Sequence, residues 1–459
     1  MPGDYETALD AAHALALAWL QTMPTRPIAP VLTIDQVKDR LGRDLAAGGA
    51  PAGTVVAQLA DAVEPGLIAM QSPRFYGFVT GGTYPAALGA DWLVSAWDQN
   101  ASFRSTTPGV VAVEELAGDW LCELLGLPPG AAVGFTTGAT SANLACLLSA
   151  RNAVLRAEGW DVEQDGLQGA PRLRLLAGAS VHGSLVAAGR MAGLGLPRLV
   201  EVDDQGRIDP DALAMVLAGE EGPAIVALQA GDVHSGAFDD FTRSIAAAHA
   251  AGAWVHVDGA FGLWAAASPS LRHLVAGHEA ADSWATDAHK TLNVPYDSGV
   301  AIVRDPAAMT AALGQRAAYL PEGSAVPEPQ DRTVELSRRA RGVPIHAALR
   351  ALGRDGVAAL LDGLVMAARA LADGLDAIPG LEVLNDVAFT QVCLAGPDDT
   401  RTAALGDWLR AEGTTWPSSS HWRGRAVVRF SVSNYGTDDQ AVRQTLDAVR
   451  RGAQAVGIG

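Results

Sequence analysis

The chain has 459 residues, of which 49% are hydrophobic and 18% are charged; this composition supplies a large core and excludes a disordered or collagen-like protein. Its 33 basic residues stand against 51 acidic ones, and the net charge of −18 disfavours nucleic acid as a partner, because phosphate binding depends on Lys and Arg. Three cysteines are too few for a disulfide framework, so we expect a cytoplasmic protein.

The sequence indicates neither a targeting signal nor a membrane span. The first residues, Met-Pro-Gly-Asp-Tyr-Glu, carry acids where a signal or transit peptide carries bases. The stretch 124–150 has no charged residue and is long enough to cross a bilayer. Pro128, Pro129 and several Gly, Thr and Asn residues would break a lipid-facing helix, however. We therefore expect a buried strand, a turn and a helix there, and no membrane partner.

The first 72 residues are predicted to form a helical arm. Apolar residues recur at helical spacing over 5–22, 33–46 and 54–70. Such helices have no core of their own, so we expect the arm (1–72) to pack on another domain or to take part in dimerisation.

Residues 73–348 are predicted to form a large α/β domain. Short apolar runs alternate with helical segments, which is typical of a mostly parallel sheet buried on both faces. The seven predicted strands cover 131–136, 173–177, 197–202, 224–229, 254–258, 281–287 and 299–305. Helices are expected to begin near Thr140, Gly183, Asp209 and Asp239.

Residues 349–459 are predicted to form a smaller α+β domain. Its expected elements are helices over 357–378 and 438–453 and strands over 381–386 and 426–433. The polar segment 318–333 contains three prolines, and we expect it to be a mobile loop.

Lysine is almost absent from the chain. The two lysines are Lys38, in a polar amphipathic segment, and Lys290, which follows an apolar strand. Ligands of parallel α/β sheets bind at the carboxyl ends of strands, and a lysine there is suited to Schiff-base chemistry. The alternative is that Lys290 is a salt-bridge partner, which is the role that we assign to Lys38.

The segment Gly138-Ala139-Thr140-Ser141 follows the first predicted strand of the large domain. Its small residues let a ligand approach the backbone, and the N–H groups of the following helix attract an anion such as phosphate. The alternative is an ordinary helix start with Thr140 or Ser141 as the cap. Because neither a P-loop lysine nor a GxGxxG motif is present, nucleotide binding is disfavoured.

Two more titratable residues follow predicted strands. Asp258 ends the apolar run WVHVD, where a carboxylate needs a cation or several donors unless it only caps the next turn. His182 follows the strand 173–177; a lone histidine is more often structural, but it could also stack on a flat ring. An anion-binding turn, a histidine, a buried carboxylate and a lysine together match the needs of pyridoxal 5'-phosphate, whose pyridine nitrogen the carboxylate would keep protonated.

Five segments carry a resemblance to a known family: FYGFVTGGTYPAALGADWL, TGATSANLACLLSAR, HGSLVAAG, HVDGAFG and DAHK. From about residue 70 to about residue 435, the sequence resembles the group II pyridoxal-phosphate-dependent amino-acid decarboxylases, which include aromatic-L-amino-acid, glutamate and diaminobutyrate decarboxylases. The resemblance implies the type I, aspartate-aminotransferase-like fold and a homodimer with a shared active site. It also implies decarboxylation of an L-amino acid, or a derivative of one, through a quinonoid intermediate.

The resemblance further implies roles for individual residues. The cofactor-binding residues would be Lys290 as the aldimine lysine, Asp258 at the pyridine nitrogen, His182 and Ala260 on the two faces of the ring, and Ala139, Thr140 and His289 at the phosphate. Lys290, His182 and Asp258 would also be catalytic. Thr80, and with it Phe78, would lie near the substrate.

Two departures from the family leave the outcome of the reaction open. Aromatic-amino-acid decarboxylases have a tyrosine on a loop after the lysine, whereas the matching region here has Pro329 or Arg332, and Tyr319 lies earlier. The run AGDVHSG replaces a Gly-Thr-Thr run and would place Asp232 and His234 near the phenolic oxygen of the cofactor. Slow protonation would allow two alternatives to simple decarboxylation. These are oxidative deamination with O2, which gives an aldehyde, ammonia and peroxide, and β-elimination by a C–S lyase.

The substrate is weakly encoded. Gly77 stands where aromatic-specific relatives carry bulky residues, and Arg104 lies in the family's pocket wall, which suggests a larger or anionic substrate. Arg104 could equally face solvent or a structural carboxylate. A catalytically inactive scaffold is disfavoured because the cofactor positions are all present. A metal site is not expected, and a metal-dependent hydrolase is disfavoured, because the ten histidines show no HExxH or paired-ligand spacing.

Overall fold

The computed structural model describes residues 2–315 and 326–459 and contains two β-sheets. The larger sheet has seven strands in the order β2-β8-β7-β6-β5-β3-β4; β8 runs antiparallel to both of its neighbours, and the other pairs are parallel. Its strands are β2 (Ala132–Thr136), β3 (Arg174–Gly178), β4 (Arg198–Val200), β5 (Ala224–Gln229), β6 (Trp254–Asp258), β7 (Ser283–Asp287) and β8 (Gly299–Val303). Each overlaps a predicted run, so the mostly parallel seven-stranded sheet is confirmed.

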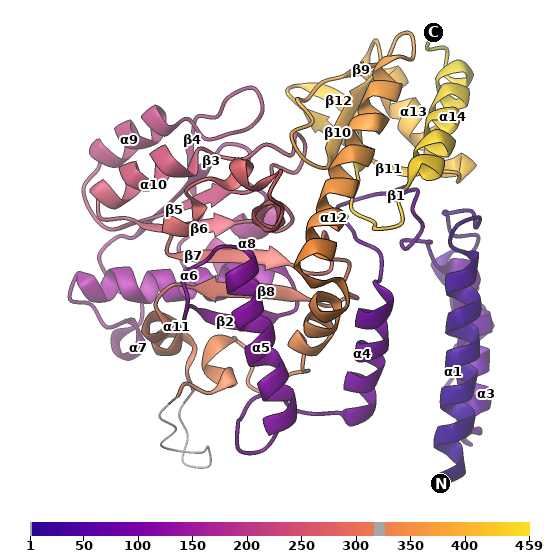
Figure 1. The fold of residues 1–459 in the computed structure, drawn as a ribbon, viewed down its shortest axis with the longest axis horizontal. Coiled ribbons are helices and arrows are strands. Elements are labelled where there is room, and N and C mark those ends of the chain that lie inside the picture. Colours follow the sequence, from indigo (N-terminus) through magenta and orange to yellow (C-terminus); the bar gives the residue numbers. More distant parts are fainter. Residues whose placement is uncertain (1, 316–325) are drawn as a thin grey trace.

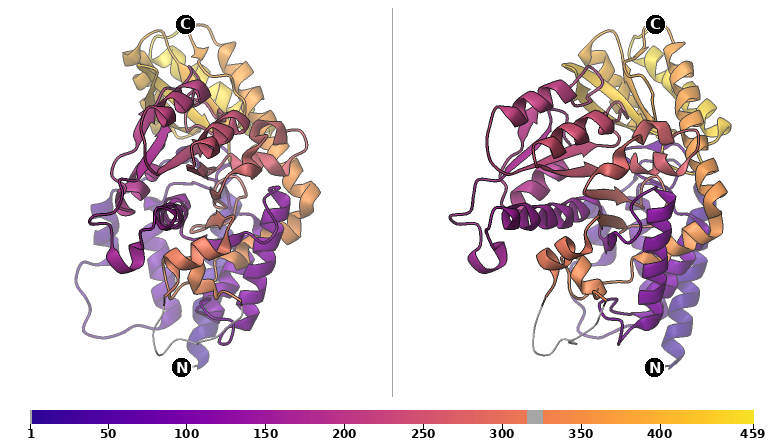
Figure 2. Two further views of the ribbon diagram at one scale, coloured as in Figure 1. Left: turned by 90° about the vertical axis from the view of Figure 1, so that its left-hand side faces the viewer. Right: turned by 60° about the vertical axis from the view of Figure 1, so that its left-hand side comes forward.

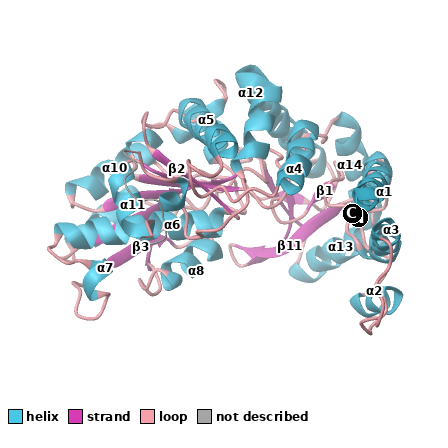
Figure 3. Ribbon diagram, turned by 90° about the horizontal axis from the view of Figure 1, so that it is seen from below, coloured by secondary structure: helices cyan, strands magenta, loops and turns pink. Residues whose placement is uncertain are grey.

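Helices cover both faces of this sheet (Figure 3). The pleat of β5 shows why: Val226 and Leu228 point into one apolar cluster, whereas Ile225 and Ala227 point into another on the opposite face. The helices on the first face are α5 (Pro108–Leu124), α9 (Pro210–Ala218), α10 (Phe241–Ala250) and the first part of α12 (Gly342–Asp376). Those on the second face are α6 (Ala139–Ala157), α8 (Gly183–Met191) and α11 (Pro306–Leu313), with α7 (Val162–Asp165) following α6. The predicted helix starts agree with α6, α8, α9 and α10.

The smaller sheet lies beside the C-terminus of the chain and has the strand order β1-β11-β12-β10-β9 (Figure 1). Its strands are β1 (Phe75–Tyr76), β9 (Glu382–Val383), β10 (Gln391–Ala395), β11 (Trp416–Trp422) and β12 (Arg425–Ser431), and its helices are α13 (Asp399–Glu412) and α14 (Asp439–Ala455). The pattern in the sequence missed β11, because its residues WPSSSHW are polar and include a proline.

The long helix α12 connects the two cores. Figure 1 shows it running from the larger sheet to the smaller one. It has a non-helical residue at Gly353, and it contributes Ile345 and Ala348 to the large core but Leu371 and Leu375 to the small one. The predicted boundary after residue 348 lies inside this helix. The other predicted boundary precedes β1, which pairs with β11 of the smaller sheet. The domain limits at 72 and 348 stay a prediction.

The N-terminal arm consists of α1 (Pro2–Thr22), α2 (Ile34–Leu41) and α3 (Ala52–Val63), with α1 packed along α3 (Figures 1 and 2). It is followed by α4 (Pro85–Trp97). No residue of α2 is buried, and α1 leaves Leu9 and Leu17 exposed. The arm thus presents apolar side chains that the described residues leave exposed.

The predicted mobile loop 318–333 lies partly outside the described residues, and so does Tyr319. Its described part contains a short 3-10 turn over Pro329–Arg332, in which Pro329 and Gln330 are buried. Within the described residues, no helix combines the length and apolar character that crossing a membrane requires.

Candidate active site

A cavity of about 450 Å³ lies at the carboxyl ends of β5 and β6. It brings together six of the residues that the sequence singled out, which are Phe78, His182, His234, Asp258, Ala260 and Lys290. Asp258 is the last residue of β6, and Lys290 follows the end of β7 by three residues. These side chains therefore lie together at the carboxyl edge of the parallel sheet, which is where ligands bind in α/β sheets.

Asp258 is a buried carboxylate with partners on both oxygens. Its Oδ1 accepts the N–H of Ala260 at 3.2 Å, and its Oδ2 accepts the side-chain amide of Asn143 at 3.0 Å. Burial raises the pKa of Asp258, while the charges of His182 and Lys290 act in the opposite direction. The carboxylate thus caps the next turn, as one alternative held, and also lines the cavity.

His182 is both a helix cap and a cavity residue. Its Nδ1 accepts the backbone N–H of Ser184 at 3.2 Å at the start of α8 and lies 2.7 Å from the hydroxyl of the same residue. Burial lowers the pKa of His182, and Lys290 adds to this effect, whereas Asp258 opposes it. A neutral imidazole with its proton on Nε2 is therefore favoured.

Lys290 forms an ion pair with Asp287, whose Oδ2 lies 2.8 Å from Nζ. The other oxygen of Asp287 accepts the N–H of Ala139 at 2.6 Å, at the start of α6, and lies 3.6 Å from Nε2 of His289. Asp287 therefore occupies the helix N-terminus at which the sequence placed a phosphate.

The start of α6 is packed closely against Gly299 of β8, and phosphate binding there stays a prediction. A Cβ on Gly299 would lie 2.4 Å from the Cα of Gly138, so residue 299 has no room for a side chain. Gly138 is the N-cap and makes no side-chain cap, which rules out the alternative that Thr140 or Ser141 caps this helix. Thr140 is exposed beside this start.

The structure places the predicted substrate residues unevenly. Phe78 lines the cavity with 58% of its surface exposed. Thr80 is buried one residue before Gly81, whose N–H donates to the carbonyl of His289 at 3.2 Å. Arg104 lies outside this cavity and forms an ion pair with Glu115. This agrees with the alternative that Arg104 faces a structural carboxylate.

The space beside Gly77 is already filled. A Cβ on this residue would lie 2.5 Å from the indole of Trp416 and 2.8 Å from the ring of Phe75. Gly77 therefore accommodates protein aromatic rings, and it gives no sign of a larger substrate.

Asp232 and His234 have different surroundings. The Oδ1 of Asp232 accepts the N–H groups of His234 and Ser235 at 2.8 and 3.0 Å, so this carboxylate caps its own turn. His234 lines the cavity, where its Nε2 lies 2.9 Å from the hydroxyl of Ser420. Burial lowers the pKa of His234.

Arg429 and Tyr296 are among the cavity residues that sequence reasoning missed. Arg429, in β12, donates to the carbonyls of Val233 and Phe78 at 3.0 and 2.8 Å, and its buried Nε has no hydrogen-bond partner in the described part of the chain. An arginine inside the apolar run AVVRFSVS was an available signal. Tyr296 also lines the cavity, and its ring stacks on His289 with centroids 4.1 Å apart.

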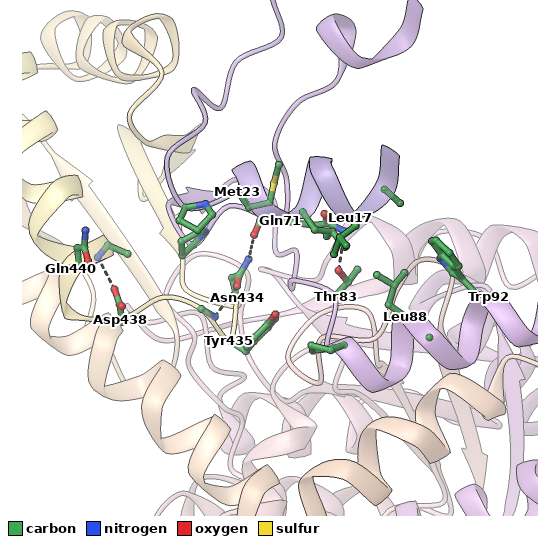
Figure 4. Close-up of a pocket in the computed structure, with 18 of the residues that line it drawn as sticks. Leu17, Met23, Gln71, Thr83, Leu88, Trp92, Asn434, Tyr435, Asp438 and Gln440 are labelled. Carbon is green, nitrogen blue, oxygen red and sulfur yellow. Dashed lines mark hydrogen bonds between the residues drawn. The ribbon is translucent and has the colours of Figure 1, made fainter. Parts of the chain in front are cut away.

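A larger cavity, of about 600 Å³, lies between α1, α4 and the segment before α14 (Figure 4). Its wall is mostly apolar, with Leu17, Met23, Leu88 and Trp92 among its residues, and Lys290 is not part of it. The smaller cavity, which contains Lys290, Asp258 and His182, is therefore the candidate active site.

The chain matches the model of the pyridoxal-dependent decarboxylase conserved domain over residues 38–395. It is 27% identical to tryptophan decarboxylase 1 of Oryza sativa subsp. japonica, over 98% of this chain and 93% of that protein. It is 30% identical to L-2,4-diaminobutyrate decarboxylase of Rhizobium meliloti, over 79% and 74% of the two chains. Phenylacetaldehyde synthase of Arabidopsis thaliana is 24% identical over 85% and 83%.

Comparison with solved structures leads to the same family. The solved structure of Oryza sativa TDC with PLP and tryptamine superimposes with a TM-score of 0.92, at 24% identity and over 99% and 98% of the two chains. The cavity residues suit pyridoxal 5'-phosphate: Lys290 offers an amine, and the buried Asp258 has oxygen lone pairs for a protonated ring nitrogen. The extent of the family match and the shared fold lead to one conclusion: the chain belongs to the pyridoxal-dependent decarboxylase family, with pyridoxal 5'-phosphate as its cofactor.

Proposed function

We propose that the protein removes the α-carboxyl group of an L-amino acid. The observation that carries this proposal is the convergence of Lys290, Asp258 and His182 on one cavity, in a chain that has only two lysines. Lys38, the other lysine, is exposed on α2.

When bound, pyridoxal 5'-phosphate supplies a sink for the electron pair that loss of CO2 leaves at the α-carbon. Lys290 would hold the aldehyde carbon of the cofactor, and Asp258 would hold a proton on its pyridine nitrogen. His182, neutral and with Nδ1 engaged by Ser184, would pack on the ring, with Ala260 at the other face.

Phosphate binding requires a rearrangement at α6. The N–H of Ala139 and the amine of Lys290 are both engaged by Asp287. We propose that the carboxylate of Asp287 withdraws when the phosphate occupies this helix start, with Thr140 and His289 completing the site. Lys290 is released by the same movement.

Arg429 would bind a substrate carboxylate. Its side chain is buried at the cavity wall, where the charge of Asp232 acts on it. Burial lowers the pKa of Arg429, and an arginine keeps its charge nonetheless. A substrate carboxylate would add a direct countercharge, while the carbonyls of Phe78 and Val233 fix the guanidinium.

The test is CO2 release from a panel of amino acids by the purified holoenzyme. The Lys290→Ala variant is expected to lose both the visible absorbance of the bound cofactor and CO2 release. Lys38→Ala is the matched control and should retain both, because Lys38 is exposed and remote in the sequence. Full CO2 release by Lys290→Ala would refute the site.

An aldehyde-forming, O2-consuming reaction is the second candidate. It is supported by the similarity to a phenylacetaldehyde synthase and by the lack of tyrosine in the described part of the loop, 326–333. The CO2 assay is therefore run with and without O2, and amine, aldehyde and peroxide are measured. A stable amine under both conditions supports simple decarboxylation, whereas O2-dependent aldehyde supports the second candidate.

Two tyrosines can be compared as the acid that protonates the α-carbon. Tyr296 lines the cavity, and Tyr319 lies outside the described residues. Tyr296→Phe and Tyr319→Phe are measured side by side in the same assay. Conversion of the product from amine to aldehyde in one of the two variants identifies that tyrosine as the proton donor.

We also propose that the protein acts as a homodimer with an active site shared between subunits. The exposed Leu9 and Leu17 of α1 and the apolar cavity beside α4 support an interface between copies. Light scattering should give twice the 47.4 kDa of one chain. A monomeric, fully active enzyme would refute the shared site.

A cytoplasmic location is part of the same proposal. Cys122, Cys146 and Cys393 are free and buried, and burial raises the pKa of their thiols to about 11, 12 and 12. Protonated, buried thiols of this kind are in keeping with a reducing compartment.

A further inference from the structure

We propose that a one-way chain of hydrogen bonds, running from Trp254 through Ser283, His256 and Asn143, positions the carboxylate of Asp258 for the cofactor. The inference rests on the proposed function, because Asp258 matters through its role at the pyridine nitrogen. Asn143 and His256 are positioning residues in this account, since they act through Asp258.

The chain of contacts is continuous and lies behind the cavity. The indole Nε1 of Trp254 lies 2.9 Å from the Oγ of Ser283, which lies 3.0 Å from the Nδ1 of His256. The Nε2 of His256 lies 2.8 Å from the Oδ1 of Asn143, whose Nδ2 lies 3.0 Å from the Oδ2 of Asp258. His256, Asn143 and Ser283 are completely buried.

The two ends of the chain fix the direction of every bond. An indole N–H can only donate, so the Oγ of Ser283 accepts from Trp254 and its own proton is free for His256. An ionised carboxylate can only accept, so Asn143 turns its NH2 toward Asp258 and its carbonyl toward His256. His256 must then carry its proton on Nε2 and accept at Nδ1.

The alternation of side chains along β6 places several members of the hydrogen-bond chain on one face of the sheet. Trp254, His256 and Asp258 are alternate residues of β6, so they project to the same face of the sheet, which α6 covers. Ser283 is the residue of β7 paired with His256, and Asn143 is a buried residue of α6. Strand β6 thus carries the carboxylate, His256 and Trp254, while α6 and β7 supply Asn143 and Ser283.

The hydrogen-bond chain opposes the effect of burial on the pKa of Asp258. Burial raises the pKa of this carboxyl, whereas the hydrogen bond from Asn143 lowers it and so favours the ionised form. Burial also lowers the pKa of His256 to about 3, which keeps its imidazole neutral. The ring therefore transmits a hydrogen bond without adding a positive charge that would compete with a protonated pyridine.

The first test uses the cofactor-free protein. Nitrogen NMR of histidine-labelled protein, with His256→Gln for assignment, should show a neutral His256 with its proton on Nε2. This state should persist from about pH 8 to about pH 5, a range in which an ordinary histidine becomes protonated. A proton on Nδ1, or titration of His256 in this range, would overturn the proposal.

The second test measures the dissociation constant of pyridoxal 5'-phosphate. Asn143→Leu removes the donor to Asp258 and is expected to weaken binding by about tenfold or more, the usual effect of losing a hydrogen bond to a charged group. Asn152→Leu is the matched control, because Asn152 is a buried asparagine of the same helix whose Oδ1 accepts from Arg151. Equal binding by the two variants would contradict the proposal.

A pair of variants at His256 separates positioning from packing. His256→Gln retains an N–H donor and is expected to bind the cofactor more tightly than His256→Leu, which cannot donate. The absorbance spectrum of the bound cofactor is recorded against pH for both variants. Indistinguishable affinities and spectra would mean that His256 only fills space. If the wild-type protein binds no pyridoxal phosphate, the proposed function fails, and the NMR test still decides the hydrogen-bond chain.

Discussion

The backbone of Gly81 touches the backbone of Lys290, the proposed catalytic lysine, and this contact yields a quantitative prediction. A Cβ added to Gly81 would lie 2.1 Å from the carbonyl oxygen of Lys290 and 3.2 Å from the Cα of Asn293. Ordinary contacts of a Cβ begin near 3.4 Å. Gly81→Ala must therefore push the two segments apart by about 1 Å, because neither obstacle is a side chain that could rotate away.

A shift of this size at a reacting group costs about 100-fold in rate. We expect Gly81→Ala to retain its fold and to lose about two orders of magnitude in kcat for CO2 release. Circular dichroism and the melting temperature verify the fold, and the visible absorbance of the bound cofactor reports on Lys290. Gly363→Ala is the control, since a Cβ at this helical position meets nothing within 4 Å.

The outcome that refutes this reasoning is a folded Gly81→Ala variant whose kcat lies within about threefold of the wild type, well short of the effect expected for a displacement of this size. It would mean that the segment carrying Gly81 can move without displacing Lys290. A loss of kcat in the Gly363→Ala control would equally contradict it, because the loss would then not depend on the contact with Lys290.

The other predictions concern burial and charge. Burial raises the pKa of Asp258 in the folded protein above its unfolded value of about 4. In the cofactor-free wild type, the contribution of Asp258 to folding stability therefore falls as the pH rises from about 4 through the folded pKa. The melting temperature of Asp258→Asn relative to wild type should therefore increase with pH over this window, and a constant difference would contradict the shift. Glu114→Gln breaks the buried pair with Arg338, whose two bonds measure 2.9 and 2.8 Å, and should cost about 3–5 kcal/mol in denaturant unfolding. Gly77→Ala should cost about 1–3 kcal/mol in the same measurement, because its Cβ meets Trp416 at 2.5 Å; unchanged stability would show that the indole moves freely.

Six of the seven strands of the large sheet could be predicted because they are short apolar runs that are almost entirely buried, and hydrophobicity alone marks such runs. The edge strand β4 is largely exposed. Strand β11 could not be predicted, since most of its residues are polar or partly exposed and its place depends on pairing with β12 and β1. Pairing between segments more than 300 residues apart, such as Phe75 with Trp416, leaves no local pattern.

The sequence by itself determined the chemical groups of the site: one lysine, one carboxylate and one histidine, each after a strand of the same parallel sheet. Only the tertiary structure decided what these groups face. It brought Asn143 and His256 behind Asp258, placed Asp287 at the helix start predicted for phosphate, and brought Arg429 of β12 to the cavity wall. The physical reason is that strand periodicity fixes the edge and the face on which a side chain emerges, whereas its partners come from elements distant in the chain and are set by packing.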